Sequence, residues 1–292
     1  MKIAVIGSLN IDYVGTTSYN LIKGESHPGY IYIQAGGVAR NIVENLARME
    51  VDVTFFTAVG KDYYGQTFKQ DLENIGVKFV MPIESKNYHT SIYFAINNNH
   101  ANMEYAIVNT DILKLINVEF LSNNIDELNK YEYVLLDTNI SQDAIDYIFS
   151  NVKSKIIVDA VSLIKSEKLI SHLDKIYLLK VNNSEYKHLE NYLIKKHPQN
   201  IIATNGSKSI DYMINNKVDH KYTPIKKEHI VSTTGAGDSL LAGTIYNILS
   251  GKTIRDSIKE GLKFSYYTLD VIETVNKNIK QLIEENKWYY WR

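Results

Sequence analysis

The stretch Gly-Ala-Gly-Asp at residues 235–238 combines the features of an anion site and of a helix start. Its small side chains leave room for a ligand, and an apolar run with helical periodicity follows directly. Free main-chain N–H groups and the helix dipole favour an anion at such a point. Asp238 could then accept a proton from a nucleophilic hydroxyl. Asp238 could instead be a simple helix cap, and this stretch alone slightly favours that interpretation.

Two other groups of residues could bind a ligand rich in hydroxyls. Asn10 and Asp12 are two positions apart, so in an extended segment they share one face. An amide beside a carboxylate suits vicinal sugar hydroxyls. Gly36 and Gly37 precede a predicted helix and permit close approach of a ligand, and Asn41 offers both a donor and an acceptor near the first turn. Each group taken alone is more often structural than functional.

The elements that must position these residues alternate between strands and helices. Six short apolar runs are continuous, as expected for strands buried on both faces; they are IAVIG (3–7), VTFFTAVG (53–60), YVLLDT (133–138), KIIVDA (155–160), IYLLKVN (176–182) and NIIATNG (200–206). Helical patterns are predicted at 38–49, 141–150, 237–250, 253–269 and 275–286. This alternation predicts an α/β fold with a doubly wound, mostly parallel sheet.

Polar residues close several of the predicted strands. Asp137, Asp159, Asn182 and Thr204 would lie at the carboxyl edge of the sheet, where ligands bind in folds of this class. Each of them could also cap the helix that follows, and the sequence leaves both roles open.

Two segments do not fit the alternation. Residues 12–34 and 88–109 each look extended, and the second has an asparagine-rich turn in its middle. We expect them to form a small antiparallel sheet that serves as a lid. No linker separates them from the rest, so the prediction is one domain over residues 1–292, with lid strands inserted at about 12–34 and 88–109.

The composition argues against several classes of function. The chain has 292 residues, with 32 Lys and Arg against 33 Asp and Glu, so a nucleic-acid partner is not expected. It contains no cysteine, which removes disulfides, zinc–thiolate sites and cysteine nucleophiles. Neither a signal peptide nor a long apolar span is evident, so we expect a cytoplasmic protein without a membrane partner.

Several motifs together resemble one family. The stretches GGVARNIVENLARM (36–49), TAVGKDYYGQ (57–66) and TTGAGDSLLAG (233–243) resemble the two signature regions of the ribokinase-like (PfkB) carbohydrate kinases. The stretch KVNNSE resembles the family's Asn-x-x-Glu motif at Asn182 and Glu185, and ATNGSKS resembles its nucleotide-binding loop at Thr204 and Gly206. The order and spacing of these motifs cover nearly the whole chain.

The resemblance implies a ribokinase-like fold and an ATP-dependent kinase. Asp238 would be the general base, and the amides of Gly235, Ala236 and Gly237 would stabilise the transferring phosphoryl group. The expected substrate-binding residues are Asn10, Asp12, Gly36, Gly37 and Asn41.

The resemblance also implies the nucleotide site and its ions. Thr204 and Gly206, with Gly235 and Gly237, would line the ATP site, and Asn182 and Glu185 would hold Mg²⁺ mainly through water. The family binds a monovalent cation near position 232. Ser232 stands there instead of the usual aspartate, which leaves potassium open. Lids of this family often pair between subunits, so a homodimer through the lid is expected.

Within the family, three stretches are similar to the pseudouridine kinases; they are residues 26–48, HTSIYFAINN (89–98) and VDAVS (158–162). The expected reaction is phosphorylation of the 5′-hydroxyl of pseudouridine to give pseudouridine 5′-phosphate and ADP. The stretch VNTD (108–111) departs from the pattern of that group. A kinase for adenosine, ribose or fructose remains an alternative, as does a non-catalytic nucleoside-binding regulator.

Overall fold

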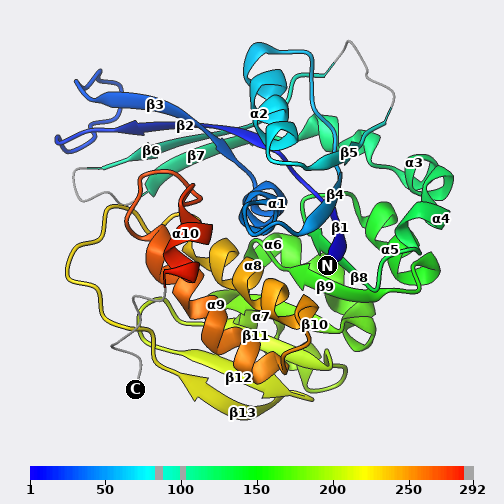
Figure 1. The fold of residues 1–292 in the computed structure, drawn as a ribbon. Helices are drawn as coiled ribbons and strands as arrows, with labels where there is room; N and C mark the ends of the chain where they lie inside the picture. Colours follow the sequence, from blue (N-terminus) through cyan, green and yellow to red (C-terminus); the bar gives the residue numbers. More distant parts are fainter. Residues whose placement is uncertain (83–87, 99–102, 286–292) are drawn as a thin grey trace.

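A computed structural model describes residues 1–82, 88–98 and 103–285 of the protein (Figure 1). A nine-stranded sheet forms its centre, in the order β13-β12-β11-β10-β9-β8-β1-β4-β5. The strands are β1 (Lys2–Ile6), β4 (Asp52–Phe56), β5 (Lys78–Val80), β8 (Tyr133–Asp137), β9 (Lys155–Asp159), β10 (Leu178–Asn182), β11 (Asn200–Thr204), β12 (Ile210–Ile214) and β13 (Lys217–Tyr222). All neighbours pair in parallel except β11–β12 and β12–β13.

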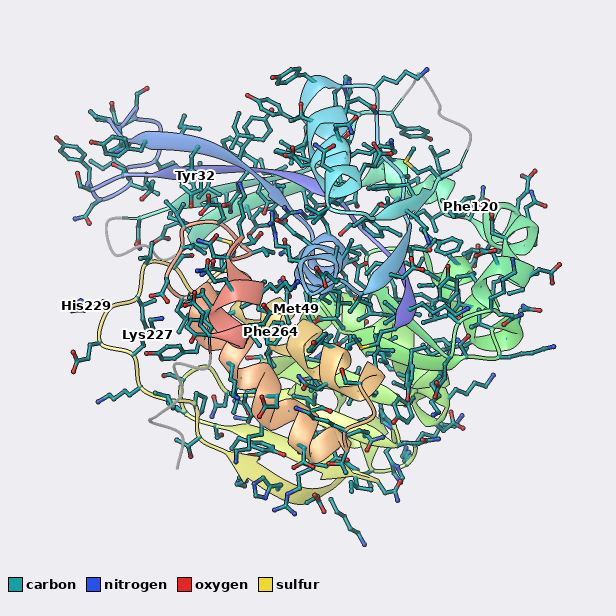
Figure 2. The ribbon with its side chains drawn as sticks, in the orientation of Figure 1. Tyr32, Met49, Phe120, Lys227, His229 and Phe264 are labelled. Carbon is teal, nitrogen blue, oxygen red and sulfur yellow. The ribbon has the colours of Figure 1, made fainter. Side chains whose placement is uncertain are left out.

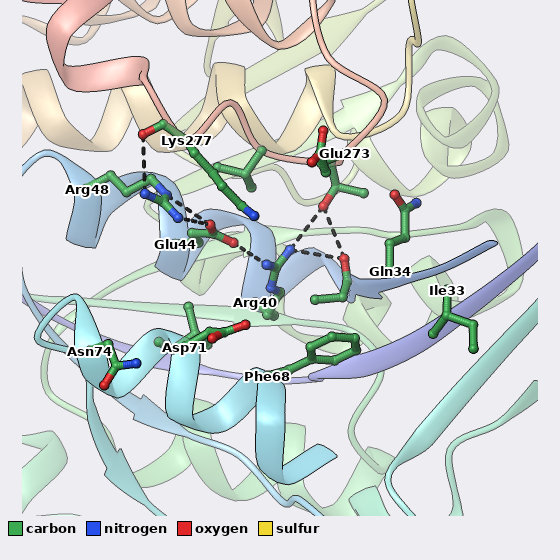
Figure 3. A pocket seen from close by; sticks show the side chains of 14 residues that line it. Ile33, Gln34, Arg40, Glu44, Arg48, Phe68, Asp71, Asn74, Glu273 and Lys277 are labelled. Atoms are coloured by element: carbon green, nitrogen blue, oxygen red, sulfur yellow. Dashed lines mark hydrogen bonds and ion pairs between the residues drawn. The ribbon is translucent and has the colours of Figure 1, made fainter. Parts of the chain in front are cut away.

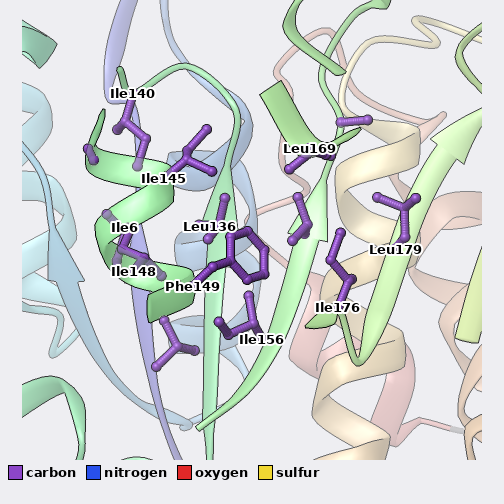
Figure 4. Close-up of a cluster of buried hydrophobic side chains, with 14 of the residues drawn as sticks. Ile6, Leu136, Ile140, Ile145, Ile148, Phe149, Ile156, Leu169, Ile176 and Leu179 are labelled. Atoms are coloured by element: carbon purple, nitrogen blue, oxygen red, sulfur yellow. The ribbon is translucent and has the colours of Figure 1, made fainter. Parts of the chain in front are cut away.

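Helices cover both faces of this sheet. One face carries η1 (Asp111–Leu115), α3 (Val118–Asn123), α4 (Ile125–Leu128), α5 (Gln142–Asn151), α6 (Leu163–Ser166), η2 (Glu167–Lys175) and α7 (Asn183–Leu193). The other carries α1 (Val38–Arg48), α2 (Tyr63–Asn74), α8 (Ala236–Leu249) and α9 (Ile254–Thr268). Successive strand residues point to opposite layers. Thus Ile6 and Leu136 pack with Ile145 and Phe149 (Figure 4), whereas Val5 and Leu135 belong to the opposite cluster.

The last helix, α10 (Ile279–Glu284), packs against α9 through a smaller cluster that includes Met49 and Phe264 (Figure 2). The helix predicted at 275–286 thus begins later, at Ile279, and ends at Glu284. Residue 286 lies outside the described residues. The side chain of Asn276 explains the late start. Its Oδ1 accepts from Asn278 N at 3.0 Å and its Nδ2 donates to Tyr267 O at 2.9 Å, which holds the backbone in a turn.

A second sheet projects from one end of the body (Figure 1). Its order is β3-β2-β6-β7, with β2 (Asn10–Thr16), β3 (Tyr30–Gly36), β6 (Ser91–Asn97) and β7 (Met103–Asn109). We refer to it as the lid. The outer pairs β2–β3 and β6–β7 are antiparallel, but the central pair β2–β6 is parallel.

The predicted fold class is confirmed, since a large, mostly parallel sheet is flanked by helices and accompanied by a small second sheet. The parallel centre of the lid refines that prediction. It follows from the chain path, because β2 and β6 both leave the body at the same edge and run outwards side by side. Among the described residues, no helix has the length and apolar character needed to cross a bilayer.

Candidate active site

The start of α8 combines a left-handed backbone with a close contact, and both favour glycine. Gly235 is the N-cap and adopts the left-handed conformation with φ +80°. A Cβ at Gly235 would lie 2.0 Å from Thr274 O, so the loop before α10 packs directly against this turn. The Gly-Ala-Gly loop is thus packed against the segment before α10 at the start of α8.

The amides of this loop are available to a ligand. Ala236 N donates to Thr233 O in a long hydrogen bond of 3.3 Å, and Ser239 N donates to Gly235 O at 2.9 Å. Within the described part of the chain, the N–H groups of Gly237 and Asp238 have no acceptor. Two free donors at the positive end of a 14-residue helix form an anion site.

Asp238 is buried beside these amides, with 9% of its surface exposed. Its Oδ2 accepts a hydrogen bond of 2.8 Å from Asn41 Nδ2, at the start of α1. Burial raises the pKa of Asp238 to about 7, while the positive charge of Lys180 and the Asn41 hydrogen bond oppose that rise and Asp159 adds to it. A carboxylate with a pKa near neutrality is well matched to proton transfer.

Lys180 is the charged residue of this site that sequence reasoning missed. Its Nζ lies 2.9 Å from Asp159 Oδ2, and a Cβ at Gly237 would lie 3.2 Å from the same Nζ. Although burial opposes its charge, Asp159 and then Asp238 raise the pKa of Lys180, which therefore stays protonated. The signal was present in the sequence, because Lys180 interrupts the apolar strand IYLLKVN two residues before its end.

One face of the lid carries polar atoms without partners. Asn10 Oδ1, Asp12 Oδ1, Gln34 Oε1 and Ser91 Oγ are all buried and make no hydrogen bond. The strand register places them together, since Asp12 pairs with Gln34 and Asn10 pairs with Ser91. Buried polar atoms are normally satisfied, so such a group indicates a surface that a polar ligand completes. Sequence reasoning had assigned no role to Gln34 and Ser91.

Asp12 is the charged member of this face. A Cβ at Gly36 would lie 2.1 Å from Asp12 Oδ2, so the glycine makes room for the carboxylate. Burial raises the pKa of Asp12 to about 7, although the charge of Arg40 opposes the rise. By the strand register, Tyr32 (labelled in Figure 2) lies on the same face of the lid, and burial and then the charge of Asp12 raise its pKa.

Gly37 is needed for its backbone conformation and for a close contact with the main chain of Ser8. Its φ is +96°, and a Cβ would lie 2.5 Å from Ser8 O. This contact lets α1 start directly against the end of β1, which brings Asn41 to Asp238. Of the predicted substrate residues, Asn41 thus contacts the start of α8 directly.

The predicted nucleotide residues lie at the neighbouring strand ends. Thr204 closes β11, and Gly206 has φ +55° in an exposed turn where nothing lies within 4 Å of its Cβ position. The turn is closed by Asn205 N, which donates to Ser209 O at 2.9 Å. It leaves open space for a ligand beside Thr204.

Asn182 and Glu185 form a capping box at the start of α7. Asn182 Oδ1 accepts from Ser184 N and Glu185 N at 2.9 Å each, and the Glu185 carboxylate accepts from Asn182 N and Asn182 Nδ2 at 2.7 Å each. Their oxygens are thus occupied, and the described residues contain no group of three or more His, Cys, Asp or Glu able to hold a metal. The pair fits a Mg²⁺ held mainly by phosphates and water, but not a direct protein cage.

Two further polar positions are structural. Asp137 is fully buried and its carboxylate accepts from Ser8 N, Ser8 Oγ and Ala39 N at 3.1–3.2 Å, which ties β8 to β1 and α1. Ser232 Oγ accepts from Thr234 N at 3.2 Å and carries no charge. The chain therefore supplies no carboxylate at position 232 for a monovalent cation.

A separate cavity of about 380 Å³ lies under the root of the lid (Figure 3). It is lined by residues of β3, α1, α2 and the loop before α10, including Gln34, Arg40, Asp71 and Thr274. Asp12, Asn41 and Asp238 do not line it. The cavity therefore lies behind the site rather than at the position of the reacting groups.

The geometry agrees with the similarity to known proteins. Residues 1–280 match the family described as pfkB family carbohydrate kinase. The chain belongs to this family. Kinases of the pfkB family transfer phosphate to a hydroxyl acceptor, use ATP, typically with Mg²⁺, and bind a small sugar or nucleoside. The protein is therefore a phosphotransferase, a sugar or nucleoside kinase.

Individual pfkB relatives differ in what they phosphorylate. Pseudouridine kinase of Escherichia coli is 28% identical over 272 residues, covering 88% of this chain and 87% of the relative. Guanosine-inosine kinase of Exiguobacterium acetylicum is 22% identical and covers 92% and 90%. The structure of a ribokinase from Thermotoga maritima superimposes with a TM-score of 0.82 at 18% identity, over 97% of this chain and 98% of that one, which concerns the fold alone.

Proposed function

We propose that the protein is a nucleoside kinase that transfers the γ-phosphoryl group of ATP to the 5′-hydroxyl of pseudouridine. The observation that carries the proposal is the contact of Asn41 with Asp238, which joins the lid-side polar face to the free amides of α8. The similarity to pseudouridine kinase of Escherichia coli supports the choice of nucleoside. The proposal treats residues 1–292 as one kinase domain into which the lid strands are inserted.

In this mechanism Asp238 accepts the proton of the attacking hydroxyl. Its pKa of about 7 allows it to be ionised when the substrate binds and to hold the proton after transfer. The amides of Gly237 and Asp238 stabilise the negative charge that develops on the transferring phosphoryl group. The ammonium group of Lys180, which lies close to Gly237, adds to this stabilisation. Ala236 contributes less than the sequence implied, because its amide already has an acceptor.

The lid face binds the sugar of the substrate. Asp12 Oδ1 and Asn10 Oδ1 accept hydrogen bonds from ribose hydroxyls, and Asn41 completes the set next to Asp238. Closure over the sugar excludes water, which would otherwise compete for the phosphoryl group.

The nucleotide occupies the ends of β10 and β11, beside Thr204 and Gly206. Mg²⁺, when bound, would neutralise phosphate charge, and Asn182 and Glu185 would hold it through water. Potassium is not part of the proposal, because Ser232 is neutral and its hydroxyl is already hydrogen-bonded.

A test of Asp238 uses the Asp238→Asn variant with Asp256→Asn as its control. Both aspartates lie in the first turn of a helix, but the Asp256 carboxylate accepts a hydrogen bond from Thr253 at the start of α9. We expect Asp238→Asn to lower kcat by about 10² to 10⁴, typical of a lost general base, with an unchanged circular dichroism spectrum. The control keeps wild-type kcat. Near-normal turnover of Asp238→Asn contradicts the assigned role.

The substrate is tested by ADP release with ATP and pseudouridine, uridine, adenosine, guanosine, ribose or fructose. We expect the highest kcat/KM with pseudouridine. A preference for a different acceptor keeps the kinase and replaces the nucleoside. Nucleoside binding without ADP release from any acceptor favours the non-catalytic regulator instead.

A further inference from the structure

The side-chain amide of Asn41 is bonded at both of its ends. Its Nδ2 donates to Asp238 Oδ2 at 2.8 Å, and its Oδ1 accepts from Arg40 Nη1 at 2.9 Å and from Thr274 Oγ1 at 2.7 Å. All three side chains that meet at Oδ1 are buried, with Arg40, Asn41 and Thr274 at most 9% exposed. The amide is therefore largely shielded from bulk solvent.

Only one orientation of this amide is compatible with its neighbours. If Asn41 were rotated by 180°, its NH₂ group would face the guanidinium of Arg40, where donor meets donor. Its oxygen would then face the carboxylate of Asp238, where two acceptors meet. The donors at Oδ1 thus decide that Asp238 receives a hydrogen bond.

Arg40 is itself held in place from several sides. Its Nη1 also donates to Ala35 O at 3.1 Å and to Thr274 Oγ1 at 3.0 Å, and its Nη2 pairs with Glu44 (Figure 3). Glu44 Oε1 in turn accepts from Arg48 Nε at 2.8 Å and Nη2 at 2.7 Å, one turn further along α1. The guanidinium therefore has little freedom to leave Asn41.

Thr274 connects Arg40 and Asn41 to the Gly-Ala-Gly loop at the start of α8. Its hydroxyl bonds Asn41, while its main-chain oxygen lies against the Cβ position of Gly235. The three segments that build the site, at the starts of α1 and α8 and before α10, thus meet through Arg40, Asn41 and Thr274. Of these three residues, Asn41 is the one that hydrogen-bonds Asp238, so Arg40 and Thr274 can affect this carboxylate through Asn41.

We propose that Arg40 and Thr274 are positioning residues that lock the Asn41 amide, so that its NH₂ group points at Asp238 and holds this carboxylate towards the acceptor hydroxyl. The inference rests on the proposed role of Asp238 in catalysis. It assigns a function to the arginine that precedes Asn41 and to a threonine far away in the sequence.

The test compares four variants of the full chain. Arg40→Gln and Thr274→Val each remove one donor to Asn41 Oδ1, and Thr274→Val does so without changing charge or size. Arg48→Gln is the matched control. Like Arg40→Gln it removes one positive charge and one partner of Glu44, but Arg48 makes no hydrogen bond to Asn41. Thr274→Ser restores the hydroxyl.

The first measurement is the titration of the Asp238 carboxyl carbon by ¹³C NMR in the free protein. The Asn41 hydrogen bond lowers the pKa of Asp238, so its loss raises that pKa. The charged neighbours Lys180, Asp159 and Asp137 are the same in every variant. We expect a higher pKa in Arg40→Gln and Thr274→Val, and the wild-type pKa in Arg48→Gln and Thr274→Ser.

The second measurement is the pH profile of kcat. We expect Arg40→Gln and Thr274→Val to lower kcat about tenfold, the effect of about 1.4 kcal/mol on the barrier, with the acid limb moved to higher pH and KM for ATP unchanged. A lower melting temperature with an unmoved Asp238 titration overturns the proposal, because it shows a merely structural role. The NMR titration needs no turnover, so it decides this inference even if no acceptor is phosphorylated and the proposed function fails.

Discussion

Asp12 and Asp238 are both buried carboxyls with a pKa near 7, but their surroundings differ. Asp238 has a donor in Asn41 and a cation in Lys180, so its charge is compensated before any ligand arrives. Asp12 has one oxygen without a partner and only the charge of Arg40 to oppose burial. An unsatisfied buried charge destabilises a fold. The ionised form of Asp12 therefore lowers the stability of the free protein.

This difference predicts that Asp12→Asn stabilises the free protein while weakening activity. The folded pKa of Asp12 is about 7 against 3.8 for an unperturbed aspartate, so ionising it costs folding free energy as pH rises through this window. We expect the variant to gain about 1–3 kcal/mol in unfolding free energy at pH 8, and almost nothing at pH 4. Its kcat/KM for the acceptor falls at least about tenfold, because a charge-assisted acceptor is lost.

Urea unfolding at pH 4, 6 and 8 measures this effect. The control is Asp52→Asn at an exposed ion pair with Lys78, which we expect to change stability by less than about 0.5 kcal/mol at each pH. A gain that is equal at pH 4 and pH 8 would falsify the ionisation argument.

Residue identity alone gave part of the site. Asp12, Asn41 and Asp238 lie in local patterns of glycines and polar residues that point to ligand binding. The structure joins Asn41 to Asp238 by a hydrogen bond and sets the Asp12 carboxylate against Gly36, just before α1. Lys180 and Thr274 reach the site through contacts between distant segments. A single sequence without such contacts cannot show that Thr274 lies beside Asn41, 233 positions away.

At the scale of elements, continuous apolar runs were enough to locate β1, β4, β8, β9, β10 and β11, because burial on both faces leaves a clear pattern. The parallel strand β5 was missed, since it has only three residues. The predicted helices at 38–49, 141–150, 237–250 and 253–269 correspond to α1, α5, α8 and α9. The start of α10 and the parallel pairing of β2 with β6 could not be predicted, because they depend on one asparagine turn and on where the chain leaves the body. The helix α8 is buried almost all round, since it lies between the sheet and α9.

The turn that starts α8 gives a prediction at this scale. Gly235 and Gly251, at the two ends of α8, both have a left-handed φ, +80° and +85°, but only Gly235 has an atom in the way of a Cβ. We expect Gly235→Ala to destabilise by about 3 kcal/mol or more, because strain and a main-chain clash add, and Gly251→Ala by about 1 kcal/mol from strain alone.

Thermal unfolding of both variants measures the difference in stability, and kcat below the melting transition measures the site. Gly235→Ala should lower kcat by at least about tenfold through displaced amides, whereas Gly251→Ala should leave kcat unchanged. Equal effects of the two substitutions would show that Thr274 yields and that the loop is not rigid.

For the whole molecule, the outer face of the lid is the feature that a single copy does not explain. The strand register places five apolar side chains on the face opposite Asp12, and all are exposed; they are Ile31, Ile33, Phe94, Tyr105 and Ile107. Contiguous apolar groups of this kind mark contact surfaces. We infer that a second copy of the chain covers this face, in line with the homodimer through the lid that the family resemblance implies.

The dimer is tested with Ile107→Asp, whose control is Ile194→Asp on the surface beyond α7. The two isoleucines are similarly exposed, 72% and 69%, but Ile194 lies far from the lid strands in the sequence and belongs to no sheet. Light scattering after size exclusion should give a dimer for the wild type and for Ile194→Asp, and a monomer for Ile107→Asp, because a charge buried in an apolar interface costs several kcal/mol. If the lid closes only when paired, the monomer also has a raised KM for the acceptor with little change in KM for ATP. A wild type that stays monomeric at micromolar concentration removes the dimer, and the apolar face then needs a different occupant.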